Sequence, residues 1–326
     1  MKSAVTLQKA PLKKRLAKRL SNAGRAWAKS FRNYWQLYLL LIPVIANFII
    51  FHYVPMTGIQ IAFKDFSLKD GVWGSEWLGF DHFQRFFGAY NFWEILGNTL
   101  ILSVISLCFS FPLSIALALM LNEIRVKRLN STLQTIFFAP HFVSTVVVVG
   151  MMQAFLSPNN GIVNILLEKV GLIEEGIYFT RLQEWFRPMY VISGLWQNMG
   201  WNAAIYISAL SAIDTSLYEA ADIDGASRWQ QLWRITIPSI WPTIIIQLIL
   251  KVGHIMSVGY EKVLLMQETT NLGVSQIIST FVYEKGIQAQ QYDYATAIGL
   301  FNSVVNLIVL LVVNRIAKKR SEVSLF

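Results

Sequence analysis

Long apolar runs alternate with shorter polar stretches along this chain of 326 residues. A helix that crosses a membrane needs roughly 20 mostly apolar residues, and six runs reach or approach that length. The helices predicted in this way are Trp35–Tyr53, Leu96–Leu121, Thr135–Leu156, Met189–Ile213, Ile240–Val258 and Ala297–Asn314. The pattern therefore predicts an all-α fold: a polytopic membrane protein with six transmembrane helices.

The composition agrees with a membrane protein and excludes other classes. Hydrophobic residues make up 54% of the chain and charged residues 14%, whereas average soluble domains carry roughly 25% charged residues. A disordered or collagen-like chain is excluded. The single cysteine, Cys108, cannot form an internal disulfide or a cysteine-rich zinc site. Because no catalytic constellation or paired metal-ligand spacing stands out, we expect neither a catalytic residue nor a metal site.

The net charge of +9 is concentrated at the start of the chain. Residues 1–34 hold ten Lys and Arg and no acid. A basic tail directly before an apolar run is typical of a cytoplasmic juxtamembrane segment. A mitochondrial transit peptide is the alternative, but Lys outnumbers Arg here and Ser is sparse.

The basic residues also predict the topology. Summed over alternate sides of the six predicted helices, 19 Lys and Arg fall on one side and 9 on the other. The richer side faces the cytoplasm under the positive-inside rule, so both termini are expected there. The predicted organisation is a basic cytoplasmic tail (1–34), a transmembrane domain (35–314) and a cytoplasmic tail (315–326).

The cytoplasmic segment between the fourth and fifth helices, residues 214–238, is the most distinctive part of the sequence. Ser216 and Glu219 have the spacing of a capping box, which predicts a helix start. Asp224 and Gly225 indicate a break, and Pro238 suits the first turn of the next helix. These signals predict two short helices joined at a glycine. The alternative is a simple amphipathic linker that lies on the bilayer.

A spaced motif in this segment resembles a known signature. Glu-Ala-Ala is followed by three residues, a glycine, nine residues and Ile-Thr-Ile-Pro. This is similar to the cytoplasmic signature of binding-protein-dependent ABC importer permeases, with Ile237 where Leu is usual. The resemblance implies a type I importer permease fold in which residues 214–238, which we call the coupling segment, dock on an ATPase subunit. The residues implied in that coupling are Glu219, Ala220, Ala221, Gly225, Ile235 and Pro238.

Other stretches resemble the carbohydrate class of these permeases, in its polysaccharide-import branch. They are Tyr53–Met56, Ile61–Phe66, Trp77–Phe80, Phe83–Phe87 and Ala297–Phe301. That branch is similar to permeases for pectin-derived and alginate-derived oligosaccharides. The resemblance implies a location in the bacterial cytoplasmic membrane, a second similar permease as partner, two copies of an ABC ATPase and an extracytoplasmic solute-binding protein.

The chain lacks a motor of its own. No G-x-x-x-x-G-K-[ST] phosphate loop occurs in the sequence. We therefore expect a transport subunit that is not an enzyme and holds no cofactor, with ATP and Mg bound by the partner ATPase.

Polar residues within the apolar runs are the candidates for a substrate path. Gln247, Lys251 and His254 share one helix face, which Glu261 is expected to continue outward. We predict that Lys251 lines the path and favours an anionic sugar such as a uronate oligosaccharide. The alternative is a structural network, or a lysine that snorkels outward.

Two further sets of side chains suit a sugar, since rings can stack on its C–H faces while amides bind its hydroxyls. Asn198, Trp201 and Asn202 lie in the fourth run, and Asn302 and Asn306 repeat the four-residue spacing in the sixth. Hydrogen bonding between helices in lipid is the alternative role for each of these amides.

Three other functions compete with that of an ABC sugar permease. A membrane-embedded enzyme would need a catalytic constellation in the spans, and none is visible. An ion-coupled secondary transporter predicts intramembrane carboxylates and inverted repeats, but the predicted spans contain almost no Asp or Glu. An ABC permease for a non-sugar solute is the third.

Overall fold

The computed structural model describes residues 30, 32–321 and 324–325, and almost all of their regular secondary structure is helical. They divide into two units, one ending at Gln60 and one starting at Ile61. The described part of the first unit is a helix that begins at Arg32 and passes through a π-helical turn, η1 (Ile49–Tyr53), and the short α2 (Val54–Met56). Its large apolar side chains are exposed all round. Such a surface suits lipid or another subunit.

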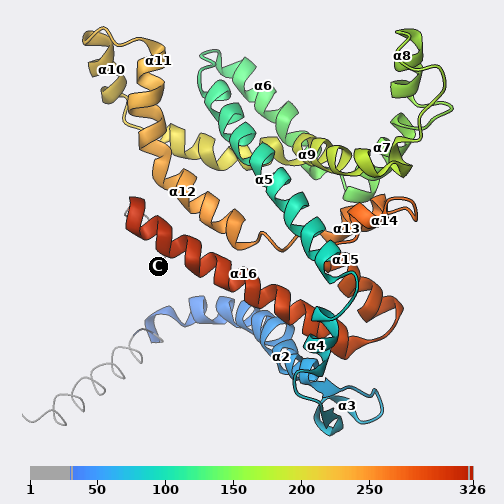
Figure 1. Cartoon of the computed structure of the whole chain (residues 1–326). Helices are drawn as coiled ribbons and strands as arrows, with labels where there is room; N and C mark the ends of the chain where they lie inside the picture. Colours follow the sequence, from blue (N-terminus) through green and yellow to red (C-terminus); the bar gives the residue numbers. More distant parts are fainter. Residues whose placement is uncertain (1–29, 31, 322–323, 326) are drawn as a thin grey trace, which may run out of the picture. The chain divides into compact units, whose positions relative to one another are not determined.

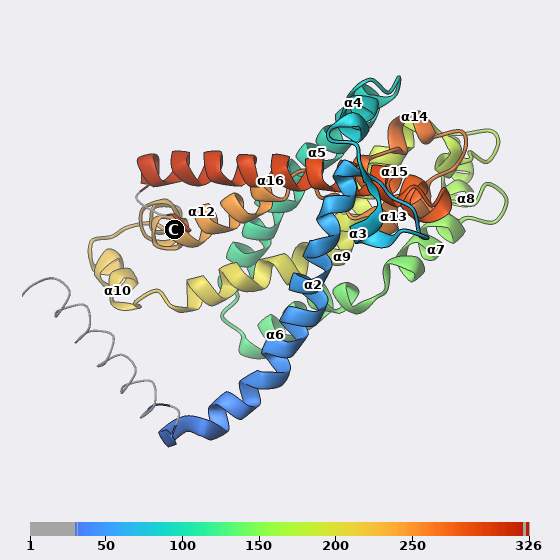
Figure 2. The ribbon, with the colours of Figure 1, turned by 90° about the horizontal axis from the view of Figure 1, so that it is seen from below.

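Four long helices build the second unit (Figure 1): α5 (Phe92–Asn122), α9 (Gln183–Ser211), α12 (Ile237–Gly253) and α16 (Tyr292–Ser321). Helix α5 packs along α9, and α12 lies beside α16 in both views (Figures 1 and 2). The expected all-α fold is confirmed.

Short elements connect the long helices. They are β1 (Lys64–Asp65), α3 (Gly71–Gly74), β2 (Glu76–Trp77), α4 (Asp81–Phe87), α6 (Lys127–Phe138), η3 (Ala139–Phe142), α7 (Thr145–Phe155), α8 (Ile162–Lys169), η4 (Phe179–Arg181), α10 (Ser216–Ile223), α11 (Arg228–Gln231), η5 (Leu232–Thr236), α13 (Tyr260–Met266), α14 (Leu272–Ser275), α15 (Ile278–Tyr283) and η6 (Glu284–Gln288). The two strands pair antiparallel, with Lys64 opposite Trp77. The 3-10 helix η2 (Thr57–Phe63) leads into the first strand.

Four helices of the described residues are long and apolar enough to cross a membrane: Arg32–Phe63, Phe92–Asn122, Arg228–Gly253 and Tyr292–Lys319. A fifth is present if the bent pair of Lys127–Phe142 and Thr145–Phe155 forms one span. Helix α9 is not among them, although its 29 residues would extend roughly 43 Å. The count of six therefore stays a prediction.

The third predicted run, Thr135–Leu156, is not one continuous helix as the sequence suggested. It breaks between η3 and α7, whose helices meet at 96°. Pro140 lies in the 3-10 turn before the break, Val143 is extended, and the Ser144 hydroxyl caps α7 by accepting the Val147 N–H at 3.3 Å. The Gln197 side chain of α9 donates to the freed carbonyl of Val143 at 2.8 Å. The break is thus satisfied by its own capping and by α9.

The fifth predicted run also ends early. Helix α12 stops at Gly253, where a side-chain Cβ would lie only 2.5 Å from Leu310 Cδ1 of α16. The chain then turns at His254, and Glu261 belongs to the separate helix α13. The expectation that Glu261 continues one face of the same helix was therefore wrong, because hydrophobic periodicity does not show at which residue a helix ends.

Helix α5 runs through three buried apolar clusters. Near its start, Phe92 and Ile95 pack with residues of α4, α15 and α16. Leu102 joins a second cluster with α7, α9 and α13. Toward its end, Leu117 and Leu121 pack with α9 and α12. Helix α5 therefore contributes to all three clusters, and the polar side chains of α5 that lie between them are held at fixed positions.

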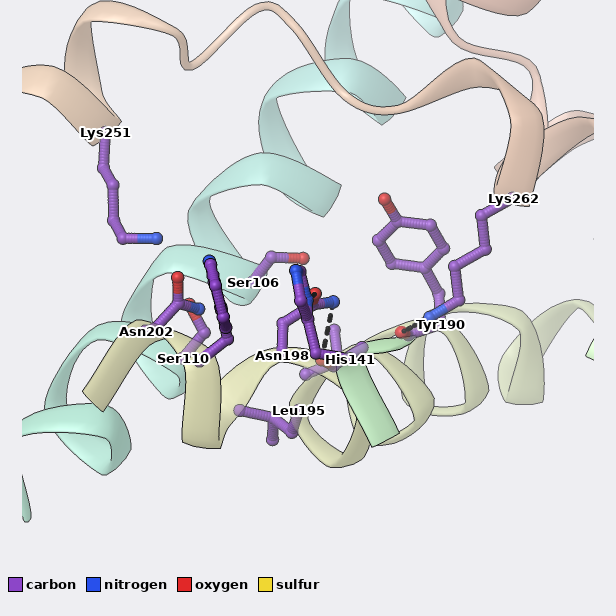
Figure 3. Close-up of a pocket in the computed structure, with 12 residues that line it drawn as sticks. Ser106, Ser110, His141, Tyr190, Leu195, Asn198, Asn202, Lys251 and Lys262 are labelled. Atoms are coloured by element: carbon purple, nitrogen blue, oxygen red, sulfur yellow. Dashed lines mark hydrogen bonds between the residues drawn. The ribbon is translucent and has the colours of Figure 1, made fainter. Parts of the chain in front are cut away.

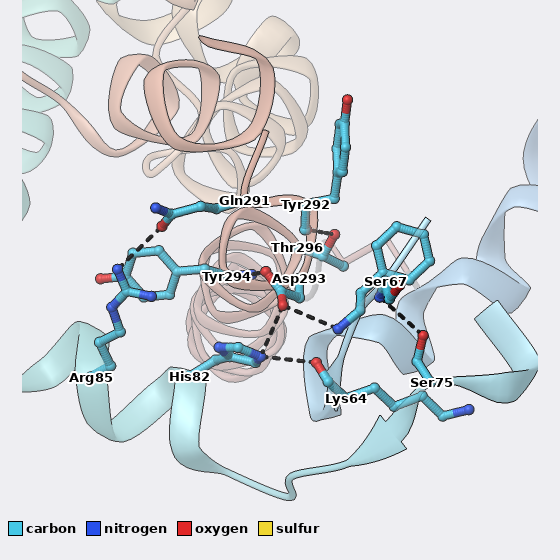
Figure 4. A network of polar contacts seen from close by, with 11 residues as sticks. Lys64, Ser67, Ser75, His82, Arg85, Gln291, Tyr292, Asp293, Tyr294 and Thr296 are labelled. Atoms are coloured by element: carbon cyan, nitrogen blue, oxygen red, sulfur yellow. Dashed lines mark hydrogen bonds and ion pairs between the residues drawn. The ribbon is translucent and has the colours of Figure 1, made fainter. Parts of the chain in front are cut away.

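The segment after β1 is tied to the start of α16 (Figure 4). The His82 ring Nε2 lies 2.9 Å from the carbonyl oxygen of Lys64 and 3.6 Å from Asp293 Oδ2, which also accepts the Phe66 N–H at 3.2 Å. Buried amides fix other loops: the Asn98 side chain donates to the carbonyl oxygens of Gly273 and Gln276. The segment after β1 and the loop around Gly273 and Gln276 are therefore held against the long helices by hydrogen bonds.

The second unit has two distinct ends. Helices α10 and α11 and the C-terminal end of α16 lie at one end, and α8 and α13–α15 lie at the other (Figures 1 and 2). The coupling segment is thus separated from the loops that join the opposite ends of the long helices.

Candidate functional site: a polar pocket and a coupling segment

A polar pocket opens between α5, α9, α12, α13 and the turn η3, with a volume of about 360 Å³. Its lining residues are Ser106, Ser110, His141, Tyr190, Val191, Gly194, Leu195, Asn198, Trp201, Asn202, Lys251 and Lys262 (Figure 3). A second hollow of about 240 Å³ shares four of these residues, Ser106, Ser110, Tyr190 and Lys251. The two hollows therefore adjoin, and we call the first one the polar pocket.

One face of α9 forms the floor of the polar pocket. Tyr190, Gly194, Asn198 and Asn202 recur every four residues, so their positions lie one above another on the helix. Gly194 leaves space in the middle of this face. Helix α5 contributes Ser106 and Ser110 opposite it.

An aromatic and amide cluster lies in the polar pocket. The His141 ring stacks on the Trp201 ring, with centroids 4.6 Å apart and planes 7° from parallel. His141 Nδ1 donates to Asn198 Oδ1 at 3.0 Å, and the Asn198 amide donates to the carbonyl oxygen of Gly194 at 3.2 Å. Trp201 stays 49% exposed. This arrangement offers a ring face next to amide and hydroxyl groups, as a sugar requires.

Two lysines reach the polar pocket from opposite sides, Lys251 from α12 and Lys262 from α13 (Figure 3). Lys262 is only 8% exposed; its Nζ donates to the carbonyl oxygen of Tyr190 at 3.2 Å and lies 4.9 Å from the centre of the Tyr190 ring. Neither lysine pairs with a carboxylate within the described residues. The pocket is therefore cationic.

The structure brings only some of the predicted path residues together. Asn198, Trp201, Asn202 and Lys251 line the polar pocket, and His254 lines the adjoining hollow. The remaining three, Gln247, Asn302 and Asn306, line neither of the two. Asn306 Oδ1 accepts the Met256 N–H at 3.0 Å, and its amide donates to the Ser257 hydroxyl at 2.8 Å. Asn306 therefore ties α16 to the turn after α12.

Sequence reasoning missed several lining residues. The four-residue spacing that joins Asn198 to Asn202 extends back to Gly194 and Tyr190, and this signal could have found them. Ser106 and Ser110 also repeat every four residues in an apolar run. Lys262 gave no signal, because it lies outside the long apolar runs.

The coupling segment ends its first helix with a specific backbone turn. Gly225 has φ +72°, a conformation that side-chain-bearing residues rarely adopt. Its N–H donates to Asp222 O at 3.1 Å, and the Ala226 N–H donates to Ala221 O at 2.9 Å. These two bonds form a Schellman motif at the end of α10. The predicted break at Gly225 is present.

The capping box lies one helix later than predicted. Ser227 Oγ accepts the Gln230 N–H at 3.3 Å, and Gln230 Oε1 accepts the Ser227 N–H at 2.7 Å, which starts α11. The expected box at Ser216 is wrong, because Asp214 Oδ1 accepts the Ser216 N–H at 3.0 Å instead. That backbone bond holds the pKa of Asp214 below its usual value.

Side-chain bonds hold the two helices of the coupling segment together. Gln231 is 3% exposed, and its amide donates to Asp222 Oδ1 at 2.6 Å. The Tyr218 and Thr236 hydroxyls lie 2.9 Å apart. Of the motif residues, Glu219 and Ala220 are exposed and Ala221 is half-buried. Around them, Ile223 and the rings of Trp229 and Trp233 are also exposed. The segment thus offers an apolar surface beside a carboxylate.

Comparison with known proteins gives a consistent result. The model of the family described as "Binding-protein-dependent transport system inner membrane component" matches residues 110–322. Protein LplB of Bacillus subtilis is 43% identical over 303 residues, which cover 93% of this chain and 95% of that protein. The polygalacturonan/rhamnogalacturonan transport system permease protein YteP of the same organism is 42% identical, with 89% of this chain and 90% of that protein covered.

A solved structure is similar over nearly the whole chain. It is a crystal structure of a bacterial ABC transporter involved in the import of the acidic polysaccharide alginate. One of its chains superposes with a TM-score of 0.83 and 42% sequence identity, covering 91% of this chain and 99% of that one.

Proposed function

The chain belongs to the family of binding-protein-dependent transport system inner membrane components, and on this basis we propose that it is the transmembrane subunit of an ATP-driven importer of oligosaccharides. As a family member it is a multi-pass membrane protein with a transport role. The cargo proposed is a fragment of a larger polysaccharide, with uronate fragments of alginate or pectin as the leading examples.

The polar pocket is the observation that carries this proposal. It combines a stacked ring pair, amides, hydroxyls and cations within a unit built from long apolar helices. Polar groups inside membrane helices are costly and mark substrate paths. The names of YteP and of the alginate importer support a saccharide as cargo.

The proposed assembly has four kinds of subunit. This chain pairs with a second, similar permease, and two copies of an ABC ATPase dock on their coupling segments. An extracytoplasmic binding protein delivers the cargo. The ATPase holds ATP and Mg, and this chain contributes no ATPase site.

The proposed orientation places the coupling segment and both termini in the cytoplasm. Two observations support it. Basic residues are more frequent on that side, and the C-terminal end of α16 lies at the same end of the second unit as α10 (Figure 2). The basic tail itself lies outside the described residues, apart from Ser30 and 32–34.

The link between the coupling segment and α12 suits the transmission of movement from the ATPase to the polar pocket. Helix α10 is linked to α11 by Gln231, and α11 runs through η5 into α12, which carries Lys251. A displacement of α10 by an ATPase would therefore reach a pocket-lining helix through continuous helical structure.

Uptake into proteoliposomes that contain the complete importer tests this function. We expect labelled trigalacturonate to enter only with ATP and the binding protein, and an ionophore to have no effect. Uptake that is independent of ATP and abolished by the ionophore would instead indicate an ion-coupled secondary transporter. An importer whose ATP hydrolysis responds to a non-sugar solute but to no saccharide would contradict the cargo.

A further inference from the structure

The residues around Lys262 hold its ammonium group at the polar pocket and leave part of that group open. The short helix α13 buries the side chain against α9, where the Tyr190 carbonyl oxygen accepts a bond from Nζ. One turn further along α9, a Cβ at Gly194 would lie 3.4 Å from Nζ, so the glycine leaves the ammonium open on that side. A lysine ammonium has three donors. The single bond to Tyr190 leaves two for another group.

The charges around the polar pocket are unbalanced. Lys251 and Lys262 approach it from opposite sides (Figure 3), and no acidic residue lines either the pocket or the hollow beside it. In the described residues, the ion pair of Lys285 with Glu284 and the contact of His82 with Asp293 lie elsewhere. A buried charge without a partner is costly, so two such cations on one pocket need a functional reason.

One polar group without a partner lies between the two lysines (Figure 3). Ser106 Oγ is buried and forms no hydrogen bond within the described residues. Trp201 presents a half-exposed ring on the same pocket. The pocket therefore combines a cation at each side with an aromatic ring and an unpaired hydroxyl in its lining.

We infer that Lys262 and Lys251 each bind one carboxylate of an acidic oligosaccharide, and that together they select acidic over neutral cargo. This inference rests on the proposed function and adds the residues that determine specificity. A carboxylate gains more from an ammonium in a low-dielectric pocket than in water. Two cations on opposite sides favour a cargo with at least two acidic sugars.

The two lysines contribute unequally. Lys262 is nearly buried and held by Tyr190, whereas Lys251 is half-buried. A positioned, desolvated donor discriminates more strongly than a mobile one. Lys262 is therefore the stronger determinant, although it lies outside the apolar runs.

The experiment compares uptake of trigalacturonate and of the same trimer with methyl-esterified carboxyl groups. The complete importer carries wild-type chain, Lys262→Met, Lys262→Arg or Lys169→Met. Lys169 is exposed on α8 and serves as the matched control. Because the binding protein is unchanged, any change in the acid-to-ester ratio comes from the permease.

We expect Lys262→Met to slow uptake of the acid about tenfold, the usual scale for losing one charge-assisted hydrogen bond, and to leave uptake of the ester within about twofold. Lys262→Arg should restore most of the acid uptake, and Lys169→Met should match wild type. Lys251→Met should lower acid uptake by a smaller factor.

Three results would overturn the inference: acid uptake by Lys262→Met equal to wild type, equal slowing of acid and ester, or no recovery with Lys262→Arg. The last two would assign Lys262 a structural role through Tyr190. If the wild-type importer does not carry the ester, the uptake of trigalacturonate by Lys262→Met and by Lys262→Arg decides. A wild-type importer that carries neither probe contradicts the uronate cargo on which the inference rests, whereas the proposed import of oligosaccharides fails only if no saccharide stimulates ATP hydrolysis.

Discussion

The coupling segment and the polar pocket differ in how their residues are distributed along the chain. The coupling segment is contiguous, and its turn is fixed by local rules: the left-handed Gly225 ends one helix, and the Ser227 capping box starts the next. The polar pocket gathers residues from positions 106 to 262, on five elements. Neighbouring residues set the backbone conformation of the coupling segment, whereas the polar pocket depends on contacts between helices that are distant in sequence. Substitutions in the two regions should therefore have different effects on transport.

Gly225→Pro should have the largest effect. Proline fixes φ near −65° and has no N–H, whereas Gly225 needs φ +72° and donates to Asp222. We expect the protein to insert in the membrane but uptake to fall to background. Gly225→Asn is the matched control, because Asn tolerates this conformation; it should keep most activity. Uptake and assembly are measured on the same preparations, and substantial uptake by the proline variant would refute the coupling role.

Trp201→Ala tests the pocket side of the comparison. It removes the ring on which His141 stacks and against which a sugar would lie. An aromatic contact contributes about 1 kcal/mol beyond area, so we expect the KM for the oligosaccharide to rise about fivefold. ATP hydrolysis without cargo should be unchanged. Trp196→Ala is the control, since Trp196 lies on α9 but lines an apolar hollow. An equal effect of both would contradict the pocket assignment.

Gln231→Leu should loosen the coupling segment without removing its turn. The buried amide bonds to Asp222 and to the Ala226 carbonyl oxygen would be lost. Leaving such groups unpaired costs about 1–3 kcal/mol. We expect faster amide exchange in α10 and roughly threefold less transport per ATP. Unchanged exchange in α10 would show that the two helices are held together by other contacts.

Asp214→Asn should have the smallest effect. The Ser216 N–H lowers the pKa of the Asp214 carboxyl from its usual 3.8. The bond therefore stabilises the helix start above that value, and this contribution is lost as pH falls through the lowered pKa. In wild type, the protection of the Ser216 amide against exchange, relative to its intrinsic exchange rate at each pH, should fall in that acidic window, and Asp214→Asn should abolish the step. A step that persists in the variant would point to another group.

Two pairs of asparagines show what the sequence could not decide. Asn198 and Asn202 in α9 have the same spacing as Asn302 and Asn306 in α16, and each pair lies in a predicted span. The first pair lines the polar pocket, and Asn306 instead binds the turn after α12. Spacing shows that two residues share a face, but only packing shows which way that face points.

The same reasoning explains the other outcomes. The break at Gly225 was predictable because it depends on neighbouring residues, and so was the family, whose motif is contiguous. The bend after Pro140 needed the Gln197 side chain of another helix to satisfy Val143. Lys262 binds the Tyr190 carbonyl oxygen and lies next to Gly194, both of which belong to α9. Such partners are distant in sequence, and hydropathy does not reveal them.

Cargo protection of a pocket residue tests the central claim most directly. A single cysteine is placed by Asn198→Cys in a Cys108→Ala chain within the complete importer, and Ile192→Cys on the same helix, beside the apolar hollow, is the control. The account predicts that a water-soluble thiol reagent labels Asn198→Cys, that trigalacturonate slows this labelling during ATP-driven turnover, and that Ile192→Cys is indifferent to cargo. Labelling of Asn198→Cys that cargo does not change would contradict the account.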